Sequence, residues 1–187
     1  TEGALINMAR SWGFDEEKLK GEMFKEGRDK TFPFNSKKKR STTVVTLANG
    51  AVRVYCKGAT EWIMKDCSTI LNSDGKATPL TETRRAEIDR IIFDMADQAL
   101  RTLTLAHKDF ASMNDLPSNW QDNPPDDKDL TIDCIVGIID PLRSDVKEAV
   151  ATAQRAGVTV RMVTGDNIAT AKAIARQCGI LMDHGVA

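Results

Sequence analysis

The chain has 187 residues, of which 41% are apolar, and its 26 basic side chains nearly balance its 27 acidic ones. This length supports one sizeable domain or one and a half, and the balanced charge gives no argument for nucleic acid or an anionic membrane as a partner. No apolar run approaches the roughly 20 residues that a bilayer-spanning helix requires. Because the chain starts at Thr1 without a signal peptide, we expect a piece excised from a longer protein.

The cysteines and histidines do not predict a metal site. The four cysteines have no short paired spacing, so we expect no zinc site and interpret them as buried free thiols of a reducing cytosol. They are Cys56, Cys67, Cys134 and Cys178. The two histidines, His107 and His184, are too few for a histidine-centred metal or catalytic cluster.

The N-terminal part begins with a helix and continues into a strand. Residues 2–12 place apolar side chains at helical spacing, and Gly13 is expected to end this helix. Residues 30–35, KTFPFN, alternate and then break at Pro33, which is typical of an edge strand or a bend.

A β-hairpin is the strongest local prediction. Residues 42–47 and 51–56 are rich in β-forming side chains and flank Asn49-Gly50, the sequence that favours a tight turn. The cationic run SKKKRS, residues 36–41, precedes them and is typical of a solvated turn between two strands.

A long helix, a strand and a loop follow. We predict a helix over residues 81–100 and a strand over residues 100–109. The helix is expected to bury a stripe that consists of Ile88, Ile91, Ile92, Met95 and Ala99. Residues 111–129 are rich in Asp, Asn, Ser and Pro, so we expect an exposed or partly disordered loop and a change of domain near Leu130.

From residue 130 the pattern changes to strand, helix, strand, helix. Residues 135–139 predict a strand buried on both faces, and Ser144 is expected to cap a helix that ends at Gly157. Residues 158–163 predict a second strand and residues 168–178 a second helix. Such an order predicts parallel strands joined by a right-handed crossover.

Polar residues follow both predicted parallel strands. Asp140 comes after the first strand, and Thr164-Gly165-Asp166 comes after the second. Ligands of parallel sheets bind beyond the carboxyl ends of the strands, so these residues are candidates for holding a phosphate. Considered alone, Thr-Gly-Asp is equally typical of turn and cap chemistry.

Several motifs in order resemble one family. MVTGDN followed by TAKAIA, and preceded by GIIDPLR, resembles the cytoplasmic part of P-type cation-transporting ATPases, and most closely the plasma-membrane-type calcium pumps. The resemblance implies an α/β (α+β) chain in two domains. Residues 1–129 would form a nucleotide-binding domain, a mainly antiparallel sheet flanked by helices. Residues 130–187 would form a partial parallel βαβα unit of a haloacid-dehalogenase-like phosphorylation domain.

The resemblance also implies an ATP site. In it, Glu2 faces the adenine pocket, Phe34 stacks on adenine, and the remaining residues contact the nucleotide or shape its pocket. These are Lys39, Arg101 and the motif Lys57-Gly58-Ala59. Taken without the resemblance, Phe34 is more typical of a core residue, Glu2 of the first turn of a helix, and Arg101 of a surface ion pair.

Activity is expected only in a longer parent. The chain lacks the Asp-Lys-Thr-Gly-Thr nucleophile motif and the Gly-Asp-Gly-x-Asn-Asp magnesium segment of the pumps. The resemblance therefore implies ATP binding without hydrolysis here, with Asp140, Thr164, Gly165 and Asp166 positioning the phosphoryl group and nucleotide in the parent. It implies Mg²⁺ held by residues outside this chain, the rest of the pump as partner, and the cytosolic face of a membrane as location. Calmodulin would act through a terminal segment that the chain does not contain.

Without a central nucleophile strand, residues 135–139 and 158–163 are expected to lack a neighbour. Their apolar faces would then be poorly ordered, shielded by another molecule, or open to self-association. Two other functions remain open from the sequence: a haloacid-dehalogenase-like phosphatase with a large cap, and a module that docks a protein through KKKR and NPPDD.

Overall fold

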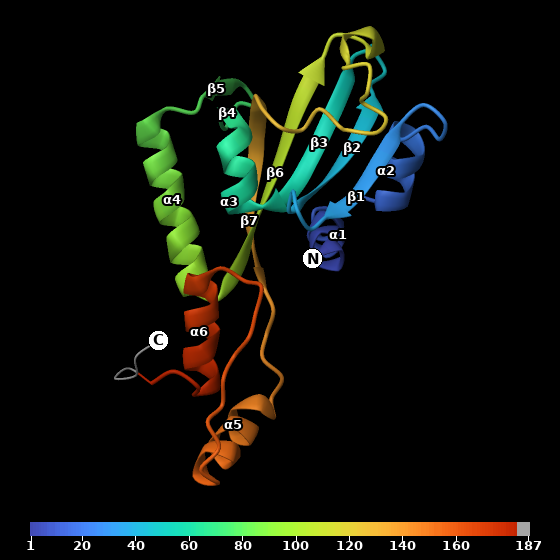
Figure 1. Cartoon of the computed structure of the whole chain (residues 1–187). Helices are drawn as coiled ribbons and strands as arrows, with labels where there is room; N and C mark the ends of the chain where they lie inside the picture. Colours follow the sequence, from blue (N-terminus) through green and yellow to red (C-terminus); the bar gives the residue numbers. More distant parts are fainter. Residues whose placement is uncertain (183–187) are drawn as a thin grey trace. The chain divides into compact units, whose positions relative to one another are not determined.

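The structure, a computed structural model, describes residues 1–182, which divide into two compact units. The first unit contains residues 1–81 and 103–136, and the second contains residues 82–102 and the chain from Gly137 onward. In chain order the elements are α1 (Glu2–Ser11), α2 (Glu16–Met23), β1 (Lys30–Asn35), β2 (Arg40–Thr46), β3 (Val52–Ala59), α3 (Thr60–Ile63), the 3₁₀ turn Met64–Asp66, β4 (Cys67–Leu71), β5 (Ala77–Pro79), α4 (Glu82–Asp97), β6 (Leu100–Phe110), the 3₁₀ turn Met113–Asp115, β7 (Leu130–Ile139), α5 (Val146–Arg155) and α6 (Ile168–Cys178) (Figure 1).

The strands form one sheet in the order β1-β2-β3-β6-β7-β4-β5. The pairs β1–β2, β2–β3, β3–β6 and β4–β5 are antiparallel, whereas β4 and β7 are parallel. This confirms the predicted mixed fold with a mainly antiparallel sheet. The units given by compactness differ from the predicted domains 1–129 and 130–187, which stay a prediction.

The β2–β3 hairpin forms where the sequence predicts it. Gly50 has a φ of +85°, and the Asn49 side chain accepts a hydrogen bond from the Ala51 amide at 3.1 Å. This is the left-handed turn geometry that glycine adopts without strain. Along both strands the side chains alternate, so Val44 faces Val54 across the pair and both are buried.

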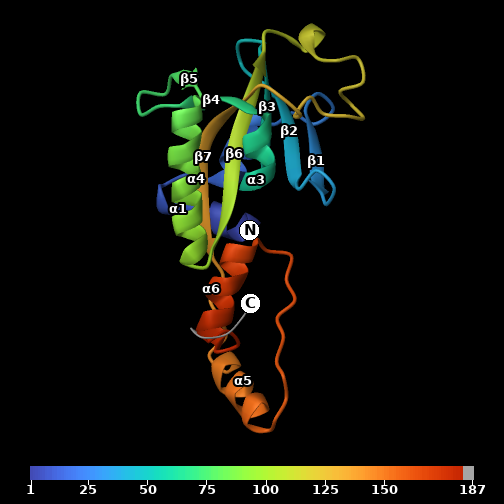
Figure 2. The same cartoon turned by 60° about the vertical axis from the view of Figure 1, so that its left-hand side comes forward.

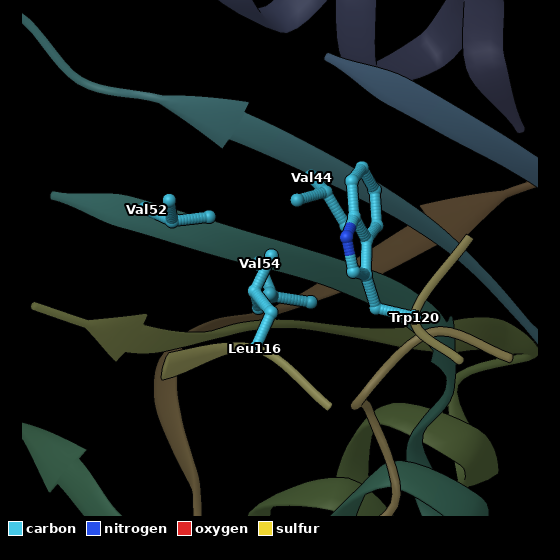
Figure 3. Packing of buried hydrophobic residues seen from close by; sticks show 5 residues of the cluster. All are labelled: Val44, Val52, Val54, Leu116 and Trp120. Atoms are coloured by element: carbon cyan, nitrogen blue, oxygen red, sulfur yellow. The ribbon is translucent and has the colours of Figure 1, made fainter. Parts of the chain in front are cut away.

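The 111–129 loop is exposed along most of its length, as predicted, but it also carries buried side chains. Leu116 and Trp120 are 7% and 8% exposed and pack on Val44, Val52 and Val54 of the hairpin (Figure 3). Although the loop is mostly polar, it contains two large apolar side chains. Their burial offsets the conformational entropy that is lost when the segment becomes ordered. The loop is therefore part of the core of the first unit.

The edge strand β1 carries a bulge at the predicted break. Phe32 pairs with Thr42 and Asn35 pairs with Arg40, so two residues of β1, Pro33 and Phe34, lie opposite one residue of β2. Proline is tolerated here because the strand is at the edge of the sheet. A bulge of this kind changes the direction of the side chains that follow it.

The second unit differs most from the prediction. Residues 158–163 form no strand and run as an irregular segment between α5 and α6 (Figure 2). Val158 and Val163 are 55% and 96% exposed. No described strand pairs with this segment, so its backbone lacks the hydrogen bonds that would make it extended structure, and the predicted parallel βαβα unit is absent. Residues 135–139 lie in β7 but are half-buried or exposed, so their predicted burial on both faces is also wrong.

The helices of the second unit form as predicted. In α6 the Asn167 side chain accepts from the amides of Ala169 and Thr170, and Gly179 ends the helix with a φ of +77°. In α5 the predicted cap, Ser144, is wrong, because Asp145 is the residue that precedes the helix, and its side chain makes no capping hydrogen bond. At the other end of α5, Gly157 follows the helix with a φ of +78°. Both helix ends follow from the left-handed conformation that glycine allows.

Two burial predictions need correction. In α4, Ile88 is buried but Ile91 is 50% exposed, because the apolar face turns partly to solvent within its own unit. Of the four cysteines, Cys134 is exposed and the other three are buried. Among the helices of residues 1–182, none combines the length and apolar character needed to cross a membrane.

Candidate nucleotide-binding site

A cavity of about 430 Å³ lies beside Lys57 in the first unit. Lys57 pairs with Ser41 on one side and Leu105 on the other, so these side chains share one face of the sheet. Glu2, at the start of α1, forms an ion pair with the Lys57 ammonium. The cavity is lined by Ser41, Thr43, Tyr55, Cys56, Lys57, Leu105, Ala106, Asp133 and Cys134. Its size is within the range of small-molecule pockets.

Gly58 is required by the packing of the backbone. A Cβ atom at this position would lie 2.3 Å from the Lys39 carbonyl oxygen and 2.8 Å from the Arg40 Cα, which are impossible separations. The next residue, Ala59, donates its amide to the same carbonyl at 3.0 Å. The Gly-Ala pair therefore fixes the cationic turn against the end of β3. The predicted close approach of a ligand at Gly58 stays a prediction.

Phe34 presents a free aromatic surface. Its side chain is 62% exposed, and the bulge in β1 places it, with Pro33, opposite Ser41. Ser41 pairs with Lys57, but Phe34 is not among the residues that line the Lys57 cavity. Phe34 instead borders a second cavity of about 260 Å³ together with Phe32, Lys38 and Thr42.

Lys39 has an unusual backbone conformation. Its φ is +54°, in the left-handed region that L-residues rarely adopt, and its amide donates to the Asn35 carbonyl at 2.6 Å. Within residues 1–182 its ammonium group has no ion pair, whereas Lys38 is paired with Asp126 and Arg40 with Asp66. The turn thus offers Lys39 as an unpaired cation.

Arg101 and the acidic residues predicted to position phosphate lie together in the second unit. The guanidinium contacts Asp166 at 3.2 Å and Asp140 at 3.5 Å. Thr164 donates its hydroxyl to the Asp166 carboxylate at 2.8 Å, and a Cβ on Gly165 would meet only open space. The N–H donors of the Arg101 guanidinium therefore lie between the carboxylates of Asp140 and Asp166.

A family comparison identifies the family of the chain. The family model described as "P-type ATPase, cytoplasmic domain N" matches residues 1–145. The chain belongs to this family.

The relatives of the chain are much longer proteins. The chain is 46% identical over all of its 187 residues to "Probable calcium-transporting ATPase 6, plasma membrane-type" of Oryza sativa subsp. japonica, which it covers to 17%. It is 48% identical over 83% of its length to "Calcium-transporting ATPase 4, plasma membrane-type" of Arabidopsis thaliana, covering 14% of it. It is 42% identical over 97% of its length to "Plasma membrane calcium-transporting ATPase 4" of Bos taurus, covering 15%. The chain thus spans about a sixth of the length of these relatives.

Sequence reasoning missed several residues of the cavity in this domain N. Ser41 and Thr43 look like ordinary strand residues, and Tyr55 and Asp133 carry no motif. The signal that identifies Ser41 is its register, because it faces Lys57 across the hairpin, and the hairpin turn predicts that register. Asp133 comes from β7, far along the chain, so only the folded sheet reveals it.

The two cysteines of the cavity differ in reactivity. Burial raises the pKa of the Cys56 thiol to about 11, so it stays protonated at neutral pH. Burial and the Asp133 carboxylate also raise the pKa of Cys134, which is nonetheless exposed. Among residues 1–182 no three His, Cys, Asp or Glu side chains are grouped as metal ligands.

Proposed function

We propose that this chain binds ATP as the nucleotide-binding part of a plasma-membrane-type calcium-transporting ATPase. The observation that carries the proposal is an exposed aromatic ring on the same sheet as several cations: Phe34 is 62% exposed in the bulge of β1, the basic residues of 36–41 follow it in the chain, and Lys57 borders a cavity. An exposed aromatic ring can stack on a purine base, and lysine ammonium groups can bind its phosphates. Membership in the domain N family supports the same function.

The adenine base stacks on Phe34 and extends toward the Lys57 cavity. Ser41 and Glu2 supply polar groups at its rim, with Glu2 held in place by its ion pair to Lys57. Lys39 meets the phosphates as a mobile point charge, because no described carboxylate neutralises it. Gly58 and Ala59 keep the cationic turn against the cavity wall.

The longer protein is proposed to be an enzyme that couples ATP hydrolysis to calcium translocation from the cytosolic face of a membrane. There Arg101 contacts the nucleotide phosphates, and Asp140, Thr164, Gly165 and Asp166 position the phosphoryl group and nucleotide. Mg²⁺ supplies neutralisation of phosphate charge when it accompanies ATP. The other domains of the pump are the partners, calmodulin acts through a segment outside this chain, and the exposed 158–163 segment is a proposed self-association surface in isolation.

The proposal is tested by titrating the chain with ATP and following backbone amide shifts by NMR. We expect shifts at Phe34, Lys39 and Lys57, and weaker binding of Phe34→Ala by about 1–3 kcal/mol, the usual contribution of aromatic stacking on one base. Phe93→Ala is the matched control because Phe93 is 61% exposed, almost the same as Phe34. Equal affinities of the two variants would refute the stacking role, and no ATP-dependent shift would refute the function.

Hydrolysis separates this proposal from the phosphatase alternative. The isolated chain is expected to give a blank phosphatase assay, because neither Asp140 nor Asp166 lies in an Asp-x-Asp or Asp-Lys-Thr-Gly setting. The domain N match favours the nucleotide-binding function over the phosphatase. Measurable turnover that is lost in Asp140→Asn or Asp166→Asn would instead favour the phosphatase.

A further inference from the structure

A buried carboxylate lies beneath the cationic turn. Asp126, in the 111–129 loop, is only 1% exposed. Its carboxylate accepts a hydrogen bond from the Thr42 hydroxyl and another from the Lys38 ammonium at 3.3 Å. Asn123 of the same loop accepts a second bond from Lys38 at 3.1 Å. Lys38 is therefore held from the loop side by two residues.

Arg40 is held from the same side. Its side chain is 6% exposed, and its guanidinium donates to the Asp126 backbone carbonyl and to the Asp66 carboxylate. It also donates to the Trp62 carbonyl at 3.3 Å. Burial alone would lower the pKa of Arg40, but the hydrogen bond to Asp66 and the nearby carboxylates raise it above its ordinary value, so it remains charged.

Lys39 lies between these two held cations and differs from both. Its backbone is fixed by the Ala59 amide and by the close approach of Gly58, at a left-handed φ of +54°. Lys38 and Arg40 are engaged by Asp126 and Asp66, whereas no described carboxylate engages the ammonium of Lys39 or that of Lys37, the residue before Lys38. Releasing Lys38 toward a phosphate would remove the ion pair of the buried Asp126 carboxylate and leave it the Thr42 hydroxyl as hydrogen-bond donor, which is unfavourable.

We propose that Asp126 is a positioning residue that sorts the cations of the turn: it withdraws Lys38 and Arg40 so that Lys39 alone of these three meets the phosphates of the nucleotide. The inference rests on the proposed ATP binding and deepens it. The 111–129 loop, which contributes Trp120 to the core, thereby withdraws two of the four cations of the turn from the triphosphate.

A matched pair of lysine variants tests the sorting. The ratio of ATP affinity to adenosine affinity is measured by calorimetry for the 187-residue chain and for Lys38→Gln and Lys39→Gln. We expect Lys39→Gln to lower this ratio about tenfold, the loss of one charge-assisted contact, and Lys38→Gln to change it less than about twofold. Glutamine keeps a donor for Asp126 at position 38. Equal losses in the two variants overturn the proposal, and this pair decides alone if the Asp126 variant does not fold.

A double-mutant cycle tests Asp126 itself. In the Asp126→Asn background Lys38 is no longer held by a charge, so Lys38→Gln should now lower the ATP-to-adenosine ratio about fivefold. Asp127→Asn is the matched control, because it removes the same charge from the exposed neighbouring residue. A purely structural role of Asp126 would lower adenosine and ATP affinity alike, with no coupling to Lys38, and would overturn the proposal.

The failure of the proposal and that of the proposed function give different results. If adenosine and ATP both fail to bind the unaltered chain, the nucleotide function itself is wrong. If ATP binds more tightly than adenosine but the lysine variants do not separate, ATP binding stands and the sorting by Asp126 falls.

Discussion

The 111–129 loop and the 158–163 segment are opposite outcomes of composition. The loop is polar and proline-rich, yet it carries Leu116 and Trp120 into the core of the first unit. The 158–163 segment is apolar and β-branched, yet Val163 is 96% exposed and no described strand pairs with it. An apolar, β-branched sequence therefore forms a strand only where another strand or surface covers it. In contrast, two buried apolar side chains are enough to order a polar loop.

The largest expected effect concerns the loop. Trp120→Ala should destabilise the chain by about 3–5 kcal/mol, because it opens a cavity over Val44, Val52 and Val54. Urea unfolding of the variant measures this. Trp12→Ala is the control, since Trp12 is 67% exposed and its loss should change stability by less than about 0.5 kcal/mol. Similar effects of both changes would mean that the loop is not part of the core.

A pair of valines sharpens the comparison directly. Val54 is 0% exposed and Val163 is 96% exposed, although the sequence predicts a strand at both positions. Val54→Ala should cost about 2 kcal/mol, and Val163→Ala close to zero. Chemical denaturation of the two variants under the same conditions makes the measurement. A cost at Val163 near that at Val54 would show that the 158–163 segment is packed in solution.

A smaller effect is expected at Asp29, which joins the start of β1 to the end of β2. The carboxylate accepts from the amides of Lys25 at 2.8 Å and Thr46 at 2.9 Å and from the Arg28 side chain. Burial alone would raise the pKa of Asp29, but these hydrogen bonds hold it below its ordinary value. Asp29→Ala should cost about 1–3 kcal/mol at neutral pH.

The sign of the pH dependence follows from the lowered pKa. The unfolded chain protonates Asp29 at a higher pH than the folded chain does, so the stabilisation is complete above the unfolded pKa and is lost as the pH falls through the folded pKa. The difference in unfolding free energy between the unaltered chain and Asp29→Asn should therefore shrink on acidification. A difference that grows toward low pH would contradict the assignment.

The reactivity of the thiols is the mildest test. Cys134 is exposed, whereas burial raises the pKa of Cys56 to about 11, so a maleimide near pH 7 should label Cys134 first. Mass spectrometry of the partly labelled chain identifies the site. Because Cys134 lines the Lys57 cavity, ATP should slow its labelling, and labelling of Cys56 ahead of Cys134 would contradict the burial described here.

Local pattern was sufficient for elements whose partner lies nearby in the chain. The β2–β3 hairpin, helix α6 and the edge strand that breaks at Pro33 were all predicted, because turn, helix-end and proline chemistry act over a few residues. The family resemblance identified Phe34 and Lys57 as candidates. It could not supply the bulge of β1, which lies between the Phe32 and Asn35 pairs, or the pairing of Lys57 with Ser41, since both depend on the strand register.

The sequence by itself determined the mixed fold, the hairpin and the family to which the chain belongs. Only the tertiary structure decided that Asp126 lies under Lys38 and Thr42, that Gly58 is required by the Lys39 backbone, and that residues 158–163 form no strand. The physical reason is the range of the interactions. Turns and caps are satisfied within a few residues, but burial of a charge and pairing of a strand depend on groups that are many residues away in the chain.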